Sequence, residues 1–209
     1  MSGCNDGCGT GIEKADKAER RVLIIVLIIN AGMFLVEFGA GIVSQSVALL
    51  ADSLDMLADA MIYALGLFAL GRAPHWKVKA AMTSGIFQMI LGVGIALQAV
   101  WRLFYGEPPD AVTMGIFGAL ALIANTISFI LLAKYRDGDI NMRATWLCTR
   151  NDMIGNVGVL LAAGLVAWLS SPIPDVVIGL IIAIIIIRSA WHVVKEAYGE
   201  GETNAHDPN

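Results

Sequence analysis

Charged residues are scarce in this chain. They make up 15% of the 209 residues, whereas 57% are hydrophobic and the mean hydropathy is +0.70. A soluble domain usually carries about a quarter charged residues, because its surface has to be wetted. The shortage therefore excludes an ordinary soluble domain. The net charge of −4 offers no argument for a nucleic-acid partner, and we expect none.

Cysteine is also rare, and three residues cannot make a disulfide framework. Cys4 and Cys8 stand in a glycine-rich stretch without a third or fourth metal ligand nearby, so they are either incidental thiols or a transient metal-capture site. Cys148 falls within an apolar run. No nucleotide-binding loop is present, which excludes ATP as an energy source.

Long apolar runs dominate what remains. Each is about 20 residues long, the length that crosses a bilayer as a helix, and none alternates as the strands of a membrane barrel do. The six expected spans are 21–43, 47–70, 80–103, 112–134, 145–169 and 173–193. The sequence predicts an all-α integral membrane bundle of six transmembrane helices at 19–195, between a mobile cytoplasmic N-terminal tail at 1–18 and a short cytoplasmic tail at 196–209.

Lysine and arginine are distributed unevenly between the loops. They cluster before the first span, after the second and fourth spans, and at the end of the sixth, whereas the opposite loops carry almost none. Positive residues are retained on the cytoplasmic side of a membrane. Both termini are therefore predicted to be cytoplasmic, in a multi-pass protein of the inner (plasma) membrane.

Carboxylates inside two spans are the main functional signal. Asp55 and Asp59 lie one helical turn apart, and Cys148 and Asp152 repeat that spacing in the fifth span. Ionisable groups at membrane depth are costly and rarely face lipid. Two facing pairs give four oxygen and sulfur donors, a set suited to a tetrahedral ion such as Zn²⁺. Without a cation the carboxylates could not all stay ionised, so metal release is coupled to proton uptake.

Other polar residues extend this pattern. Asp52 and Asn156 continue the two stripes, and Asn30 and Glu37 share a face of the first span; we expect these four to support the site. Interhelical hydrogen bonds are expected at Asn125, Gln88 and Asn156. Two alternatives stay open: a structural cluster in which the carboxylates pair with Arg150, and a pure proton pathway. One arginine cannot balance three carboxylates.

Three stretches, SVALLADSLDMLADA, NAGMFLVEFGAG and NMRATWLCTRNDMIGNVGVLLAA, resemble the cation diffusion facilitator family of metal/proton antiporters. The resemblance implies cytoplasmic termini and a transport site built from two pairs on helices 2 and 5. Asp55, Asp59 and Asp152 match three of its positions. The fourth is commonly His or Asp but here is Cys148, whose softer thiolate suits Zn²⁺ or Cd²⁺ better than Mn²⁺. Alternatively, Cys148 is not a ligand, and three carboxylates bind the ion with water.

Many family members carry a cytoplasmic domain after helix 6, and we expect this chain to be a short form without it. We also expect a homodimer, although the usual dimer contact would then be missing. The resulting hypothesis is a secondary transporter, not an enzyme, that exports a divalent transition metal (zinc before cadmium or cobalt) by proton antiport. The metal is its substrate, and no cofactor is expected. A membrane metal-binding sensor or assembly module and an intramembrane aspartyl hydrolase are the alternatives.

Overall fold

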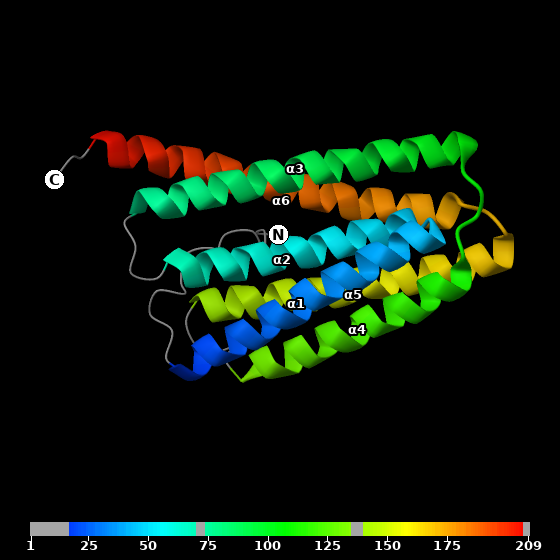
Figure 1. Cartoon of the computed structure of the whole chain (residues 1–209), viewed down its shortest axis with the longest axis horizontal. Coiled ribbons are helices and arrows are strands. Elements are labelled where there is room, and N and C mark those ends of the chain that lie inside the picture. Colours follow the sequence, from blue (N-terminus) through cyan, green and yellow to red (C-terminus); the bar gives the residue numbers. More distant parts are fainter. Residues whose placement is uncertain (1–16, 70–73, 135–139, 207–209) are drawn as a thin grey trace.

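In the computed structural model, which describes residues 17–69, 74–134 and 140–206, the chain forms six helices (Figure 1) and, over these residues, no strand. The helices are α1 (Lys17–Ser44), α2 (Val47–Ala69), α3 (Pro74–Tyr105), α4 (Ala111–Ala133), α5 (Ile140–Leu169) and α6 (Ile173–His206). The prediction of an all-α bundle is confirmed. Helix α6 continues beyond Lys195, where the short C-terminal tail was expected to begin.

Five of the six helices are long and apolar enough to cross a membrane: α1, α3, α4, α5 and α6. Their outer faces expose large apolar side chains, such as Ile28 (61% exposed), Leu35 (70%) and Ile130 (65%). An apolar surface of this extent is unfavourable in water, whereas it is favourable in contact with lipid chains. The chain is therefore a multi-pass membrane protein. Helix α2 is not among the five because it carries three acidic residues within one span length, Asp52, Asp55 and Asp59.

Helix α2 is the centre of the bundle. It packs against all five other helices, and in Figure 1 it lies between the α3–α6 pair and the crossing helices α1 and α5. Its first residues, 47–51, are almost completely buried. Its aspartates are therefore enclosed by protein on most sides, which is how a charged helix can persist at membrane depth.

The core consists of two apolar clusters and a set of buried polar side chains, which we call the polar layer. The larger apolar cluster is built around the first half of α2 and the second half of α5, and includes Leu49 and Val166. The smaller one joins Leu23 and Val26 of α1 to Tyr63 and Leu132. The polar layer is contributed by four helices and consists of Asn30, Glu37, Asp52, Asn125, Ser128 and Asn156. The layer places the polar chemistry part-way along the bundle.

The link between α1 and α2 is a tight helix-ending motif. Gln45 adopts a left-handed conformation with φ of 58°. Its amide donates to the carbonyl of Ile42 (3.3 Å), and the amide of Ser46 donates to the carbonyl of Gly41 (3.0 Å). These are the two bonds of a Schellman ending, which satisfies carbonyls that a helix end leaves free. Helix α2 can therefore begin at once, at Val47.

Asp175 of α6 satisfies the start of α2. Its Oδ1 accepts from the Ser46 hydroxyl (2.6 Å) and the Ala48 amide (3.0 Å), and its Oδ2 accepts from the Val47 amide (2.8 Å). The Ser46 hydroxyl oxygen in turn accepts from the amide of Leu49 (3.0 Å). A helix start exposes amides that need acceptors, and a carboxylate there also suits the helix dipole. One side chain of α6 thus fixes where α2 begins.

The same junction is closely packed. A Cβ atom on Gly179 of α6 would lie 2.8 Å from the carbonyl carbon of Val47 and 2.9 Å from the amide nitrogen of Ala48. Only glycine allows α6 to approach the α2 backbone so closely. Arg102 of α3 is buried near this junction and interacts electrostatically with Asp175. Three helices therefore hold the first turn of α2 in place.

Helix α4 begins with a cap outside the apolar core. Asp110 accepts from the Val112 amide (3.0 Å) and from the Thr113 hydroxyl (2.8 Å). Donation from Thr113 and Val112 holds the pKa of Asp110 below its usual value, so this cap stays ionised at neutral pH.

Candidate metal site

Three of the expected ligands meet between α2 and α5. Asp55 and Asp59 project from α2, and the carboxyl of Asp152 on α5 lies within hydrogen-bonding range of both. All three side chains are partly exposed. The hydroxyl of Tyr63 also donates to Oδ2 of Asp59 (3.4 Å). The structure thus places Asp152 of α5 beside Asp55 and Asp59 of α2.

The carboxylate oxygens of Asp55, Asp59 and Asp152 do not surround a single position that a metal ion could occupy. In the part of the chain that the structure describes, no group of three or more His, Cys, Asp or Glu side chains is close enough to hold a metal ion. Asp152 is repelled electrostatically by Asp52, Asp55 and Asp59 when all are ionised. A bound divalent cation would relieve this mutual repulsion.

The fourth expected ligand cannot be placed. Cys148 belongs to α5, but its side chain lies outside the described residues, as do Cys4 and Cys8. Its ligation therefore stays a prediction.

A second group of polar side chains is fully buried. Asn125 of α4 donates to Oδ1 of Asn156 on α5 (2.9 Å), and Asn156 donates to Oδ2 of Asp52 on α2 (2.5 Å). The carboxyl of Asp52 lies in hydrogen-bonding range of Glu37 on α1. We refer to Asn125, Asn156, Asp52 and Glu37 as the polar chain. It links four helices through the polar layer.

The supporting residues thus divide into two kinds. Asp52 contacts both Asn156 and Glu37, and Asp52 and Asn156 each stand one helical turn from a candidate ligand. Asn30 is buried, but its amide donates to the carbonyl of Val26 in its own helix (3.0 Å). The interhelical bond expected of Asn125 and Asn156 is confirmed. Gln88 instead donates to Ser84, one turn earlier in α3.

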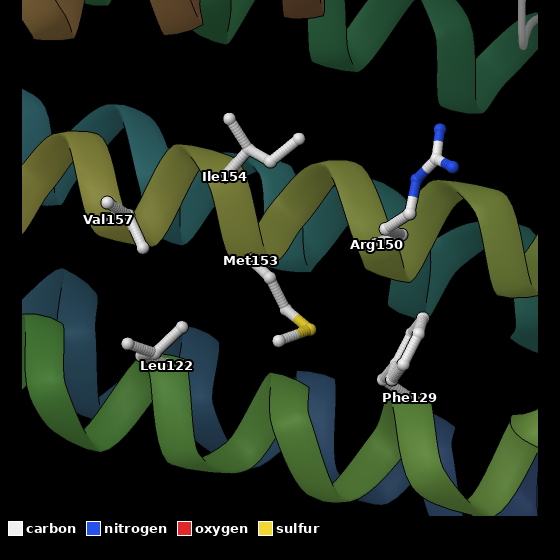
Figure 2. Close-up of a pocket in the computed structure, with 6 residues that line it drawn as sticks. All are labelled: Leu122, Phe129, Arg150, Met153, Ile154 and Val157. Carbon is white, nitrogen blue, oxygen red and sulfur yellow. The ribbon is translucent and has the colours of Figure 1, made fainter.

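Arg150 does not join the carboxylates. It is exposed on α5 and lines a cavity of about 320 Å³ between α4 and α5. Figure 2 shows its guanidinium pointing away from Leu122 and Phe129 of α4. The remaining lining residues, Met153, Ile154 and Val157, are apolar. This cavity offers no ligand for a metal ion, and its position does not favour the alternative of an Arg150-balanced cluster.

Asp175 is a residue that sequence reasoning missed. An aspartate in the first turn of a helix normally acts on its own helix, and the only signal was its place at the start of an apolar run. Its partners, Ser46 to Ala48, are more than 120 residues away in sequence. Only the packing of α6 against α2 reveals that it supports the helix carrying the aspartates.

Comparison with known proteins decides the family. The family described as the cation efflux transmembrane domain matches residues 23–200, most of the chain. This chain belongs to the cation efflux family. The resemblance to the cation diffusion facilitator family is thereby confirmed, as is the expectation that the chain is not an enzyme.

Several bacterial relatives in the family are named for metals. The chain is 30% identical to the zinc transporter ZitB of Escherichia coli, over 86% of this chain and 62% of that protein. It is 28% identical to a cadmium, cobalt and zinc/H⁺-K⁺ antiporter of Bacillus subtilis, again over 86% and 62%. The cation efflux system protein CzcD of an Alcaligenes species is 25% identical, over 85% and 60%. The chain thus spans about three-fifths of the length of these relatives.

Proposed function

We propose that this chain exports a divalent transition-metal cation from the cytoplasm in exchange for protons. Zinc is the first candidate, followed by cadmium and cobalt, the metals named in its relatives. The metal is the transported substrate and not a resident cofactor. The observation that carries the proposal is the meeting of Asp152 on α5 with Asp55 and Asp59 on α2.

The ligand set fits this cargo. Asp55, Asp59 and Asp152 supply carboxylate oxygens, and Cys148 one turn before Asp152 would supply a thiolate. Mixed oxygen and sulfur donors in fourfold coordination suit Zn²⁺, and the sulfur adds affinity for Cd²⁺. A bound cation would offset the repulsion among the three carboxylates.

Exchange with protons follows from the same charges. Metal ligands must be deprotonated, so protons and metal compete for the carboxylates. Lowering the pH weakens metal binding, and raising it strengthens binding. The B. subtilis relative is named for H⁺-K⁺ antiport, which supports proton exchange as the energy source here.

The distribution of positive residues supports a defined orientation. We place both termini in the cytoplasm and the loops at 45–46, 106–110 and 170–172 on the outer side of the inner (plasma) membrane. Metal would then enter from the side of the termini. We also propose a homodimer, as the family resemblance implies.

Metal flux in reconstituted vesicles tests the proposal. Zinc should accumulate in vesicles when their interior is more acidic than the outside, because protons then leave in exchange for the zinc that enters. Asp55→Ala, Asp59→Ala and Asp152→Ala should each abolish this flux while the protein still inserts, because a four-donor site loses both a ligand and a charge. Uptake of radioactive zinc, or the signal of a zinc-sensitive dye inside the vesicles, measures the flux. Circular dichroism checks that each variant keeps its helix content.

A matched control keeps the result specific. Glu107→Ala removes a carboxylate from an exposed loop position, and its flux should equal that of the wild type. Zinc binding without flux would favour the sensor or assembly module. Wild-type flux in Asp59→Ala would reject the site itself.

A further inference from the structure

Glu37 is enclosed without a hydrogen-bond donor. The side chain is 0% exposed, and among the described residues neither of its carboxyl oxygens accepts a hydrogen bond. An ionised carboxylate in that position would be very costly at membrane depth. Its neighbour is the carboxyl of Asp52, in hydrogen-bonding range. Two ionised carboxylates carry no hydrogen that could form a hydrogen bond between them. The contact therefore requires a proton on one of the two groups.

Asp52 differs from Glu37 in having a donor. The Asn156 side chain presents its amide hydrogens to Oδ2 of Asp52, because its own oxygen is occupied by Asn125. A donor favours the ionised form of the carboxylate that accepts from it. Within the pair, Asp52 is therefore the ionised member, and Glu37 carries the hydrogen.

The ionisable side chains around the pair are mainly acidic. The carboxylate of Asp55 repels negative charge on both Glu37 and Asp52, and the carboxylate of Asp152 on α5 repels negative charge on Asp52. Helix α4, which packs against α1, has no ionisable residue from Ala111 to Ala133. Helices α3 and α6 also pack against α2. Their charged residues near the first turn of α2 are Arg102 and Asp175, which attract each other electrostatically. Negative neighbours favour retention of a proton by the pair.

We propose that Glu37 and Asp52 form a proton-binding site separate from the metal ligands, which holds one exchanged proton. In the metal-free state the hydrogen is bonded to a Glu37 oxygen and donated to Asp52. When a divalent cation neutralises Asp55 and Asp152, the negative field that retains the proton weakens. The O–H bond of Glu37 then breaks and the proton leaves to water; because two ionised carboxylates cannot stay in contact without a shared hydrogen, Glu37 moves away from Asp52 toward water in this step. The inference rests on the proposed metal exchange and assigns part of its proton to α1.

Proton release on zinc binding tests this assignment. Calorimetry of the purified full chain in buffers of different ionisation enthalpy gives the protons released per zinc ion. Glu37→Gln keeps the shape of the side chain but has no exchangeable carboxyl proton, so it should release up to one proton fewer per zinc ion. Glu37→Gln should still bind zinc, because Glu37 is not a ligand, but more weakly than the wild type, by the free energy that couples zinc binding to release of this proton. Glu107→Gln, which removes an exposed carboxylate, should release the wild-type number.

A measurement on the wild-type chain covers the case in which Glu37→Gln does not fold. Glu37 is the one glutamate within the six expected spans, and the proposed metal ligands include none. Infrared difference spectra should show a protonated carboxylic acid band that shifts on carbon-13 labelling of glutamate and disappears when zinc is added. Zinc binding without loss of such a band, or full proton release from Glu37→Gln, would overturn the inference but leave the metal site intact. Failure of the wild type to bind zinc would overturn the proposed function and this inference with it.

Discussion

The acidic side chains of α2 differ in how far water reaches them. Asp52 is 2% exposed, whereas Asp55 and Asp59 on the following turns are partly exposed. A cation entering from water can therefore meet Asp55 and Asp59 directly, whereas Asp52 is reached only through other side chains. Residues on one stripe of one helix are thus suited to two tasks, metal contact and proton retention.

Cys148 is the residue whose role can be decided most directly. In a chain with Cys4 and Cys8 replaced by serine, saturating Zn²⁺ should protect Cys148 from alkylation, because a coordinated thiol is held as thiolate by the metal. Cys148→Ser should weaken Cd²⁺ binding more than Zn²⁺ binding, since a hydroxyl oxygen disfavours the softer ion. Mass spectrometry of the alkylated chain and competitive binding measure the two effects.

The opposite result would also be informative. If metal leaves the alkylation of Cys148 unchanged and Cys148→Ala transports normally, Cys148 serves only in helix packing. The site would then consist of Asp55, Asp59 and Asp152 with water.

The sequence was sufficient for contacts that depend on helical spacing. Asp55 and Asp59 share a face because they are four residues apart, and a buried Asn156 was expected to bond across helices. The pairing of Glu37 with Asp52 was not predictable in detail, because the crossing of α1 and α2 depends on packing along both helices. The bonding of Asp175 to the start of α2 was not predictable for the same reason, because it depends on how α6 packs against α2.

At the scale of the element, α2 depends on its neighbours more than any other helix. Its first amides bond to Asp175, and its first turn lies directly against Gly179 of α6. Gly41 of α1 approaches it from another side, where a Cβ atom would come within 2.9 Å of the Leu50 side chain. The aspartates one to three turns later are therefore placed by contacts made at the helix start.

Gly179→Ala should destabilise the bundle by about 1–3 kcal/mol, because the added methyl meets backbone atoms of Val47 and Ala48 that cannot rotate aside. Zinc affinity should fall as well, since α2 must shift relative to α5. Thermal unfolding in detergent and zinc titration measure both effects.

Gly164→Ala on α5 is the matched control, because a Cβ atom there has no neighbour within 4 Å. That variant should be as stable as the wild type or up to about 1 kcal/mol more stable. Equal stability of the two variants would show that the α2–α6 approach is less tight than described.

At the scale of the whole molecule, the two ends of the bundle differ in charge. The apolar spans were readable from the sequence because membrane helices need continuous apolar runs, and five of the six helices meet that requirement. Helix α2 departs from it because three aspartates replace apolar residues inside the bundle. The proposed orientation of the bundle rests on the lysine and arginine asymmetry alone.

Substituted cysteines test that orientation. In a chain with Cys4 and Cys8 replaced by serine, a membrane-impermeant thiol reagent should reach Glu107→Cys from the outside of intact cells. Lys134→Cys, at the other end of α4, should react only after the membrane is opened. Ser170→Cys should behave like Glu107→Cys, because both positions lie in loops at the same end. Labelling of positions 107 and 134 from one side would reject the topology.

The bond between Asp175 and the start of α2 also has a consequence for biosynthesis. The ribosome makes α2 well before α6, and residues 47 and 175 are 128 positions apart in the chain. A nascent α2 therefore carries three aspartates and uncapped amides with no acceptor from α6 within reach. We expect it to remain at the translocon or in contact with water until α6 emerges, and to enter its final position last. Chains truncated before Asp175 should then leave α2 accessible to proteases and targeted by membrane quality control.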